Sequence, residues 1–359
     1  MKLQKANAPL LRKVNQSRIR QALWKLREAT KYQLAQETGL SQMTVNNVLA
    51  GLQENGEAEE EGRMPSEGGR PSTLYRYRGS YGHALALYSF QDRGRSLVRL
   101  HVIDLLGNCV YQDNAWFNLL QPDSFGKMLE KAFQAVAGIR LIGFGLPGEA
   151  VGEEITLCDH KTLLGTELLQ GCRKKYGVPA VFYNDINATV YGYYRRLFGE
   201  GNCSYPVSGI YFPRNFPPGM GLIVNGSPYL GHCSFAGEIG SLPFGTDWFA
   251  LDYEDRDQVR SAVGDLLAIV CSVAAPGRCA LYGDFFIPED REPILERART
   301  RLGGGYEVFA EILSSPEKDY ELGIEELLLR ALRRQLFGDP TDWAREAAGK
   351  AGNKEKIGC

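Results

Sequence analysis

The sequence contains no run of apolar residues near the roughly 20 that a membrane-spanning helix needs. Its first residues also lack the apolar core of a secretion signal. The eight cysteines are scattered without close pairing, and a chain of 359 residues buries enough core to need no disulfide staples. We therefore expect a cytoplasmic protein with reduced thiols, no membrane segment and two or three domains.

The net charge of -2 hides an uneven distribution of charge along the chain. The first 31 residues carry nine Lys or Arg and a single acid, Glu28. A basic segment on a mildly acidic body suggests that this segment binds a polyanion. A solvated basic helix face would have the same composition, so the pattern of the segment must decide.

That pattern is typical of a helix-turn-helix. Residues 15–28 and 31–38 have helical periodicity, and Gly39 stands where a left-handed turn ends the second helix. Ser41 is placed to cap a third helix. Its buried face is predicted to contain Val45, Val48, Leu49 and Leu52.

The opposite face of the third helix carries the candidate DNA-reading residues Gln42, Thr44, Asn46 and Asn47. Such side chains reach base edges and phosphates from the major groove. Residues 57–77 read as a β wing, and Arg70 near its tip is a candidate for the minor groove.

Four acids at the base of the wing conflict with this interpretation: Glu57, Glu59, Glu60 and Glu61. Either this strand points away from DNA, or the affinity is modest and strongly dependent on salt.

From residue 79 onward, strands and helices alternate, which predicts an α/β body with a central mixed sheet. Strands are expected at residues 84–90, 96–104, 109–116, 141–144 and 180–183. Helices are expected at residues 124–137, 166–176, 188–197, 291–302, 305–313 and 324–336. The polar residues 339–359 read as a tail.

Four motifs along the body resemble the ROK family of repressors, open reading frames and sugar kinases. They are Leu146-Pro147-Gly148, Asn184-Asp185-Ile186-Asn187, Gly219-Met220-Gly221 and Gly237-Glu238-Ile239-Gly240. ROK repressors also begin with a winged helix-turn-helix that ends in a Gly-Gly-Arg-Pro arm, as at residues 68–71 here.

The resemblance implies an actin-like, ribonuclease H-like body with two α/β lobes, a sugar cleft between them, and assembly as a homodimer or homotetramer. The expected division is a DNA-binding head at residues 1–78, lobe I at 79–190, lobe II at 191–338 and the tail at 339–359. The last helix is expected to return to lobe I.

The candidate sugar ligands follow a strand. Asn184 and Asp185 come directly after the apolar residues 180–183, where carboxylate and amide groups can bind sugar hydroxyls. A helix cap would use the same residue types. By resemblance, Asp185 matches the catalytic base of the family, Asn184 and Glu238 match sugar ligands, and Gly148 lies at the cleft wall.

The phosphate-binding loops of the family are lacking. The turn at residues 89–94 has a phenylalanine and an acid in place of glycines, and Asp284 stands in a family Gly-Gly pair. Pro217 and Pro218 remove two N–H donors, and Phe216 is expected to fill the space of a hydroxyl. We therefore expect no kinase activity.

The zinc ligands of the family are lacking as well. By resemblance, Ser241 stands in place of a histidine that binds sugar hydroxyls and precedes a Cys-rich zinc loop, and residues 241–270 contain no His or Cys. We expect no metal and no cofactor. Trp248, Phe249 and Tyr253 near this position would either fill the space of the missing zinc loop or stack on a sugar. We favour the first alternative.

The sequence thus predicts a sugar-responsive transcriptional regulator, namely a repressor, that binds a double-stranded DNA operator and a sugar or sugar phosphate effector. Three alternatives stay open. They are a constitutive DNA-binding protein with a vestigial cleft, a sugar kinase that uses Asp185 as base, and an assembly scaffold.

Overall fold

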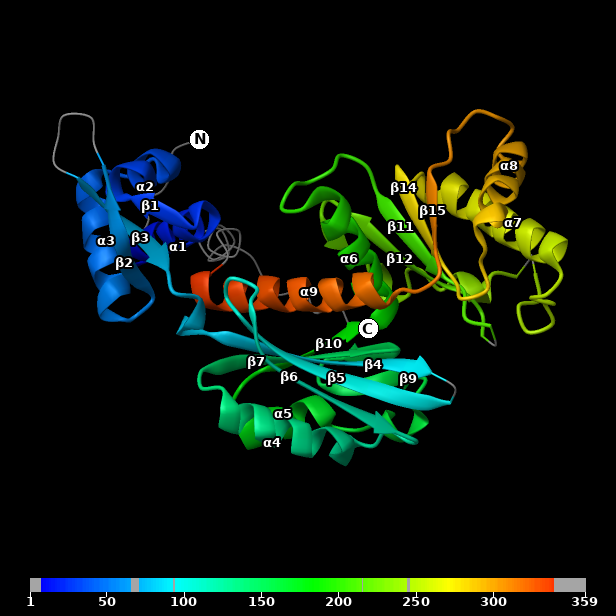
Figure 1. Ribbon diagram of the computed structural model, residues 1–359, viewed down its shortest axis with the longest axis horizontal. Coiled ribbons are helices and arrows are strands. Elements are labelled where there is room, and N and C mark those ends of the chain that lie inside the picture. The colour runs from blue at the N-terminus through cyan, green and yellow to red at the C-terminus, as the bar shows by residue number, and fades with distance from the viewer. Residues whose placement is uncertain (1–7, 66–70, 93, 215, 244–245, 339–359) are drawn as a thin grey trace, which may run out of the picture.

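The computed structural model describes residues 8–65, 71–92, 94–214, 216–243 and 246–338, and Figure 1 shows how they are arranged. A small helical head lies at one end of a long C-terminal helix, α9 (Glu317–Phe337). Two five-stranded sheets lie on either side of that helix. Within these ranges, no helix is both long enough and apolar enough to cross a membrane.

The head contains three helices and a three-stranded sheet of order β1-β3-β2. Its elements are α1 (Ala8–Leu26), β1 (Glu28–Thr30), α2 (Lys31–Thr38), α3 (Gln42–Glu54), β2 (Ala58–Met64) and β3 (Ser72–Tyr77). Thr30 and Ser41 cap α2 and α3, and Gly39 ends α2 at φ +68°. These local signals explain why the predicted helix-turn-helix is found.

The first body sheet has the order β10-β7-β4-β5-β6. Its strands are β4 (His83–Asp92), β5 (Arg95–Asp104), β6 (Cys109–Phe117), β7 (Ile139–Leu146) and β10 (Ala180–Asn184). Helices α4 (Gly126–Ala135) and α5 (Leu168–Tyr176) bury their apolar sides against one face. The small hairpin β8 (Gly148–Val151) and β9 (Glu154–Cys158) follows β7.

The second body sheet has the order β13-β12-β11-β14-β15. Its strands are β11 (Val207–Tyr211), β12 (Gly219–Val224), β13 (Ser227–Pro228), β14 (Arg278–Tyr282) and β15 (Ala310–Leu313). Helix α6 (Asp185–Phe198) packs on one face, and α7 (Arg256–Ala274) and α8 (Arg291–Arg301) cover the other.

The two sheets repeat one topology. In the first, β4, β5 and β6 form an antiparallel meander, and β7 and β10 add in parallel beside β4. In the second, β11, β12 and β13 form the meander, and β14 and β15 add in parallel beside β11. This duplication is the two-lobed arrangement expected for an actin-like body.

Helices α6 and α9 cross at two glycines. A Cβ atom on Gly192 of α6 would overlap the Asp319 carbonyl oxygen, and one on Gly323 of α9 would overlap the Ala188 carbonyl oxygen. The helices therefore meet backbone to backbone. Helix α9 also packs on β4 and β7, and its last turn reaches α1 of the head.

Apolar and aromatic contacts fix the head to α9. The rings of Tyr77 and Phe337 lie edge to face with centroids 5.1 Å apart, and the Arg333 guanidinium lies 4.0 Å from the centroid of the Trp24 ring. One continuous hydrophobic core runs from the head into the body.

The structure corrects several expectations. Residues 305–313 are not a helix, because Ala310–Leu313 pair with β14 as strand β15. Helix α1 begins at Ala8, well before the expected residue 15, and Leu26 is 36% exposed. Residue 190, where lobe I was expected to end, lies inside α6. The expected division of the chain into domains stays a prediction.

Candidate functional site

Helix α3 presents the polar face that was predicted to read DNA. Gln42, Asn46 and Asn47 are exposed, whereas Thr44 is half-buried. The Ser41 hydroxyl accepts a hydrogen bond from the Thr44 amide at 3.2 Å and lies 2.9 Å from the Thr44 hydroxyl. Thr44 therefore belongs partly to the cap, and the other three residues are free to meet a ligand.

A groove of about 480 Å³ separates α3 from the first half of α1. Thr44 and Asn47 line it from α3, and Arg12 lines it from α1. Arg12 is exposed, so its guanidinium is available to phosphate oxygens beside the predicted base-reading residues. Sequence reasoning missed this role because the first helix was expected to begin after Arg12.

Two large exposed side chains of the head were also missed. Met43 on α3 is 75% exposed and Tyr32 on α2 is 57% exposed. An exposed apolar side chain on a recognition helix can contact the thymine methyl group. The position of Met43 between Gln42 and Thr44, outside the buried stripe, was the available signal.

The first wing acid is buried and paired. Glu57 is 2% exposed, and its two carboxylate oxygens accept hydrogen bonds from Arg20 at 2.6 and 2.7 Å. The Tyr77 hydroxyl donates to the same carboxylate at 3.2 Å. Glu57 therefore ties α1 to the wing and does not face DNA.

Arginines of β3 and the residue after it neutralise the next acids. Arg76 pairs with Glu59 at 2.7 Å and with Glu61 at 2.8 Å, and Arg78 pairs with Glu59 at 2.8 Å. Hydrogen bonds from Arg76 and Arg78 lower the pKa of Glu59. The wing base thus carries little net charge. Pairing of the acids with arginines was not among the two explanations that the sequence suggested. Arg70 lies outside the described residues.

The predicted sugar ligand Asn184 has structural partners. It caps α6 by accepting a hydrogen bond from the Asn187 amide at 2.9 Å, and it donates to the Gly148 carbonyl oxygen at 3.1 Å. Gly148 has φ +140°, and a Cβ atom there would overlap the Leu157 carbonyl oxygen. These two residues therefore fix the junction of β10, β8 and α6.

Asp185 begins α6 at the carboxyl end of β10. Its Oδ1 accepts a hydrogen bond from the Ile186 amide at 2.9 Å. Burial raises the pKa of Asp185 to about 7, and the charge of Asp159 adds to the rise. The carboxyl group is therefore close to half protonated near neutral pH.

Two further groups near Asp185 were not singled out from the sequence. The Asn187 Oδ1 atom is buried without a hydrogen-bond partner among the described residues. Tyr320 of α9 is 3% exposed, and burial and the Asp185 charge raise its pKa well above the ordinary value. Tyr320 could not be found because α9 was expected to begin at residue 324.

Glu238 and Ser241 lie at the two ends of a short 3-10 helix (Ile239–Ser241) that follows β13 and packs beside β12. Gly237 has φ +101°, and a Cβ atom there would overlap the Met220 carbonyl oxygen, so glycine permits this segment to approach β12. Glu238 and Ser241 are both exposed. Burial raises the pKa of Glu149 on β8, and the charge of Glu238 raises it further.

The residues that replace the phosphate-binding loops of the family differ in their burial. Phe90 packs against Tyr88 and Tyr320, with ring centroids 5.7 and 5.3 Å apart. Phe216, which was expected to fill a hydroxyl's space, is 57% exposed, and that expectation stays a prediction. Pro218 is buried.

Asp284, which was singled out in place of a glycine, has a cationic partner. The Arg214 Nε atom donates to Asp284 at 3.0 Å, and Arg214 also approaches Glu254 at 3.4 Å. This ion pair connects the loop after β11 with the loop after β14.

Aromatic residues occupy the region beyond Ser241. Trp248 is 7% exposed and packs against Phe212 with centroids 5.5 Å apart. The Tyr253 hydroxyl donates to the Pro213 carbonyl oxygen at 3.2 Å. Trp248 and Tyr253 thus pack into the protein, whereas Phe249 is 72% exposed, and the expectation that these residues fill the space of a zinc loop stays a prediction.

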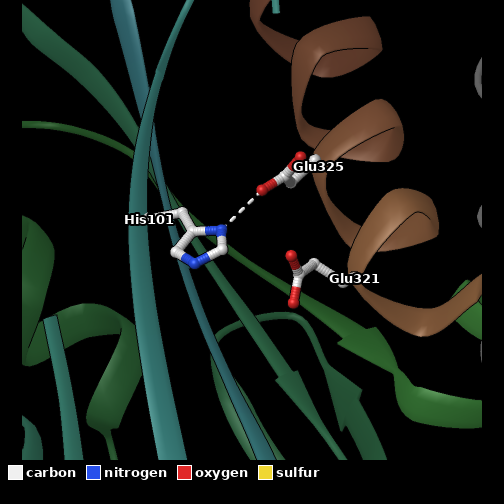
Figure 2. Close-up of side chains that lie close together, drawn as sticks. All are labelled: His101, Glu321 and Glu325. Atoms are coloured by element: carbon white, nitrogen blue, oxygen red, sulfur yellow. Dashed lines mark hydrogen bonds and ion pairs between the residues drawn. The ribbon is translucent and has the colours of Figure 1, made fainter. Parts of the chain in front are cut away.

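Figure 2 shows a separate polar cluster between β5 and α9. His101 Nδ1 lies 2.6 Å from Glu325 Oε1, and one ligand atom each from His101, Glu321 and Glu325 lie within 4.8 Å of one another. Such a set could hold a divalent cation. Arg99 already donates to Glu321 at 2.9 Å, so the cluster serves as a polar seam that joins α9 to the first sheet. The expected absence of metal stays a prediction.

The chain is similar in sequence to two xylose repressors. The repressor of Caldicellulosiruptor bescii is 24% identical over 246 residues, which cover 65% of this chain and 59% of the repressor. That of Bacillus subtilis strain 168 is 24% identical over 246 residues, which cover 66% and 62%. The match thus spans about three fifths of the length of these relatives. No profile of a known protein family matches the chain.

Solved structures share the fold. A ROK family transcriptional regulator, a homologue of the E. coli MLC protein, aligns with a TM-score of 0.61 and 14% identity over 91% of this chain and 99% of its own. A ROK hexokinase from Thermus thermophilus aligns with a TM-score of 0.55 and 16% identity over 70% and 99%. The alignment with this regulator covers 91% of the chain, so it must include residues of the head as well as the body.

Proposed function

This chain has the fold and the sequence motifs of the ROK family, and on that premise we propose that it is a sugar-responsive transcriptional repressor. The observation that carries the proposal is the exposed polar face of α3 on a head that shares one core with the two-sheet body. The head would bind a double-stranded DNA operator, and the body would bind the effector.

For DNA binding, we propose base contacts from Gln42, Asn46 and Asn47 and a phosphate contact from Arg12. Thr44 would contribute from the edge of the groove that it shares with Arg12. The ion pairs of Arg76 and Arg78 support this arrangement, because they remove the repulsion between the wing acids and phosphates. Arg70 stays a proposed minor-groove contact.

For the effector, we propose a site at the start of α6, with xylose as the first candidate because the relatives are xylose repressors. Asp185 and the unpartnered Asn187 Oδ1 can accept hydrogen bonds from sugar hydroxyls. Glu149 of the β8–β9 hairpin and Glu238 after β13 would close the site, and Asn184 and Gly148 would hold its wall. Ser241 would stand at its rim.

Helix α6 supplies the route from sugar to DNA. It begins at Asp185, and its last turns reach Arg195 beside the head, about 15 Å further along the helix axis. A shift of α6 on sugar binding would therefore reach the contact between the head and α9. A homodimer would bring two heads to two half-sites.

The body would bind sugar without phosphorylating it. Phe90 packs on Tyr320, and Pro217 and Pro218 offer no N–H donors to a nucleotide phosphate. The Asp185 pKa of about 7 is suited to a general base, and this observation favours a sugar kinase as the second candidate. An assay of ADP release with ATP and a panel of sugars decides; we expect no sugar-dependent release.

The test of the main proposal is fluorescence anisotropy with the DNA upstream of the protein's own gene, with and without a panel of sugars that begins with xylose. We expect Asn46→Ala/Asn47→Ala to weaken DNA binding and Asn114→Ala, an exposed control on β6, to leave it unchanged. Asp185→Ala should bind DNA but lose the sugar response. DNA binding that no sugar alters would indicate a constitutive regulator, and no DNA binding at low salt would refute the proposal.

A further inference from the structure

The polar cluster between β5 and α9 takes no part in the proposed DNA or sugar binding. His101 belongs to β5, and Glu321 and Glu325 lie one turn apart on α9. A ligand atom from each of the three lies within 4.8 Å of the other two. The expectation that the chain holds no metal was based on the ligands missing around Ser241, and this cluster did not enter that reasoning.

The three side chains of the β5–α9 cluster point toward one another (Figure 2). His101 Nδ1 lies 2.6 Å from Glu325 Oε1, and the Tyr88 ring packs edge to face on the imidazole with centroids 5.5 Å apart. Arg99 donates to Glu321 Oε2 at 2.9 Å, which holds this carboxylate and leaves its Oε1 atom available. Outer contacts of this kind orient the ligands of metal ions. The side chains of His101 and Glu321 are 11% and 35% exposed, so an ion can enter from the Glu321 side.

The carboxylates along this side of α9 outnumber the cations that pair with them. Glu317, Glu321 and Glu325 follow one another at intervals of four residues, and like charges at this spacing repel one another. Arg99 pairs with the first two at 3.1 and 2.9 Å. In the part of the chain that the structure describes, Glu325 pairs with His101. Three carboxylates therefore share one guanidinium and one imidazole.

Groups on the two neighbouring strands are exposed to this negative charge. Burial raises the pKa of Tyr88 on β4, and the charges of Glu321 and Glu325 raise it further. Burial also raises the pKa of the Cys109 thiol on β6, and the same two carboxylates add to the rise. A cation between the carboxylates would offset this charge.

We propose that the β5–α9 cluster binds a divalent transition-metal cation, with His101 Nδ1, Glu321 Oε1 and Glu325 Oε1 as ligands. One imidazole and two carboxylates suit zinc or manganese, whereas magnesium and calcium prefer oxygen ligands alone. Ligand atoms about 2.0 to 2.2 Å from one ion lie roughly 3.0 to 3.4 Å from each other. His101 and Glu325 therefore need to separate by less than about 1 Å, and the proton between them is released. The cation would join β5 to α9.

The test is isothermal titration calorimetry of the full-length protein, first treated with a chelator that is then dialysed away. Zinc, manganese and magnesium chlorides are the separate titrants. We expect zinc or manganese to bind at one ion per chain, and magnesium to bind about tenfold more weakly or less. The bound ion should also raise the melting temperature, because it binds the folded chain. Absence of binding by both zinc and manganese, or equal affinity for magnesium, overturns the proposal.

Variants of α9 locate the ion. Glu321→Gln and Glu325→Gln each keep the size of the side chain and remove a charged ligand, so each should weaken binding by about tenfold or more. Glu296→Gln, at an exposed position on α8, is the matched control and should not change the affinity. Circular dichroism in the absence of added metal checks that each variant is folded. Wild-type affinity in both α9 variants overturns the proposal.

A further variant tests another place where zinc could bind. His232 and Cys233 are neighbours on an exposed turn, with Nδ1 and Sγ 3.1 Å apart, and imidazole and thiolate are both zinc ligands. His232→Ala/Cys233→Ser should leave one ion bound per chain with unchanged affinity. Loss of binding in this variant, with wild-type affinity in Glu325→Gln, would place the ion at the turn and overturn the proposal.

Discussion

Replacing Asp185 by asparagine should stabilise the protein more at pH 8 than at pH 5. The pKa of this carboxyl is about 7 in the folded protein, against an ordinary value of 3.8. Its neutral form is therefore favoured by folding. Stability from this group is fully present below the unfolded-state pKa and is lost as the pH rises through the folded-state pKa. Asparagine keeps the shape of the side chain and cannot ionise.

The magnitude follows from the two pKa values. Ionisation of the folded carboxyl lowers stability by about 1.4 kcal/mol for each pH unit between roughly pH 4 and pH 7. Between pH 5 and pH 8 this gives a ceiling of about 2.5 kcal/mol. Asp185 is only partly buried, so water screens its charge, and we expect about 1 kcal/mol.

The assay is urea unfolding of wild type and Asp185→Asn at both pH values, and the quantity compared is the difference in unfolding free energy. Asp123→Asn is the matched control, because Asp123 is an exposed aspartate in the first turn of a short helix. An equal difference at pH 5 and pH 8, or a variant that becomes relatively less stable at pH 8, would refute the reasoning. Such a result would mean that Asp185 is well solvated and is unsuited to act as a base or a pH-sensitive ligand.

Three further predictions test the head and the helix crossing. Glu57→Ala should lower the free energy of unfolding by about 3 to 5 kcal/mol, because Arg20 loses its buried partner, whereas the exposed Glu60→Ala should have little effect. Asn47→Ala should weaken operator binding by about 1 to 3 kcal/mol in anisotropy titrations, and equal affinities would exclude a base contact. Gly192→Ala should lower the melting temperature strongly, since its Cβ overlaps a backbone carbonyl, while Gly171→Ala on α5 meets open space and should raise or preserve it. A tolerated Gly192→Ala would contradict the close crossing.

The sequence predicted the head well because its signals are local. Caps at Thr30 and Ser41, the left-handed Gly39 and the apolar stripe of α3 each act within a few residues. By contrast, β15 was expected to be a helix. Its four residues form a strand only because β14 lies beside them, and that neighbour is distant in the sequence.

Candidate sites were predictable to different degrees. Asp185 could be found because it directly follows an apolar strand, and its position at the start of α6 agrees with that reasoning. Tyr320 and the pocket between α1, α6 and α9 could not be predicted from the sequence, because both depend on how α9 packs against distant elements. The same limit applies to the wing acids, whose arginine partners were visible in the sequence while their pairing was not.

The backbone contact between α6 and α9 has a consequence for how such a protein can diversify. Gly192 and Gly323 set the distance between the two helices, because neither position leaves room for a Cβ atom. Under the proposed mechanism, substitutions around Asp185 would change which compound is recognised and would leave the crossing of α6 and α9 unchanged. Proteins with this fold could then acquire new ligand specificities without a change in how the body contacts the DNA-binding head, provided that both glycines are kept.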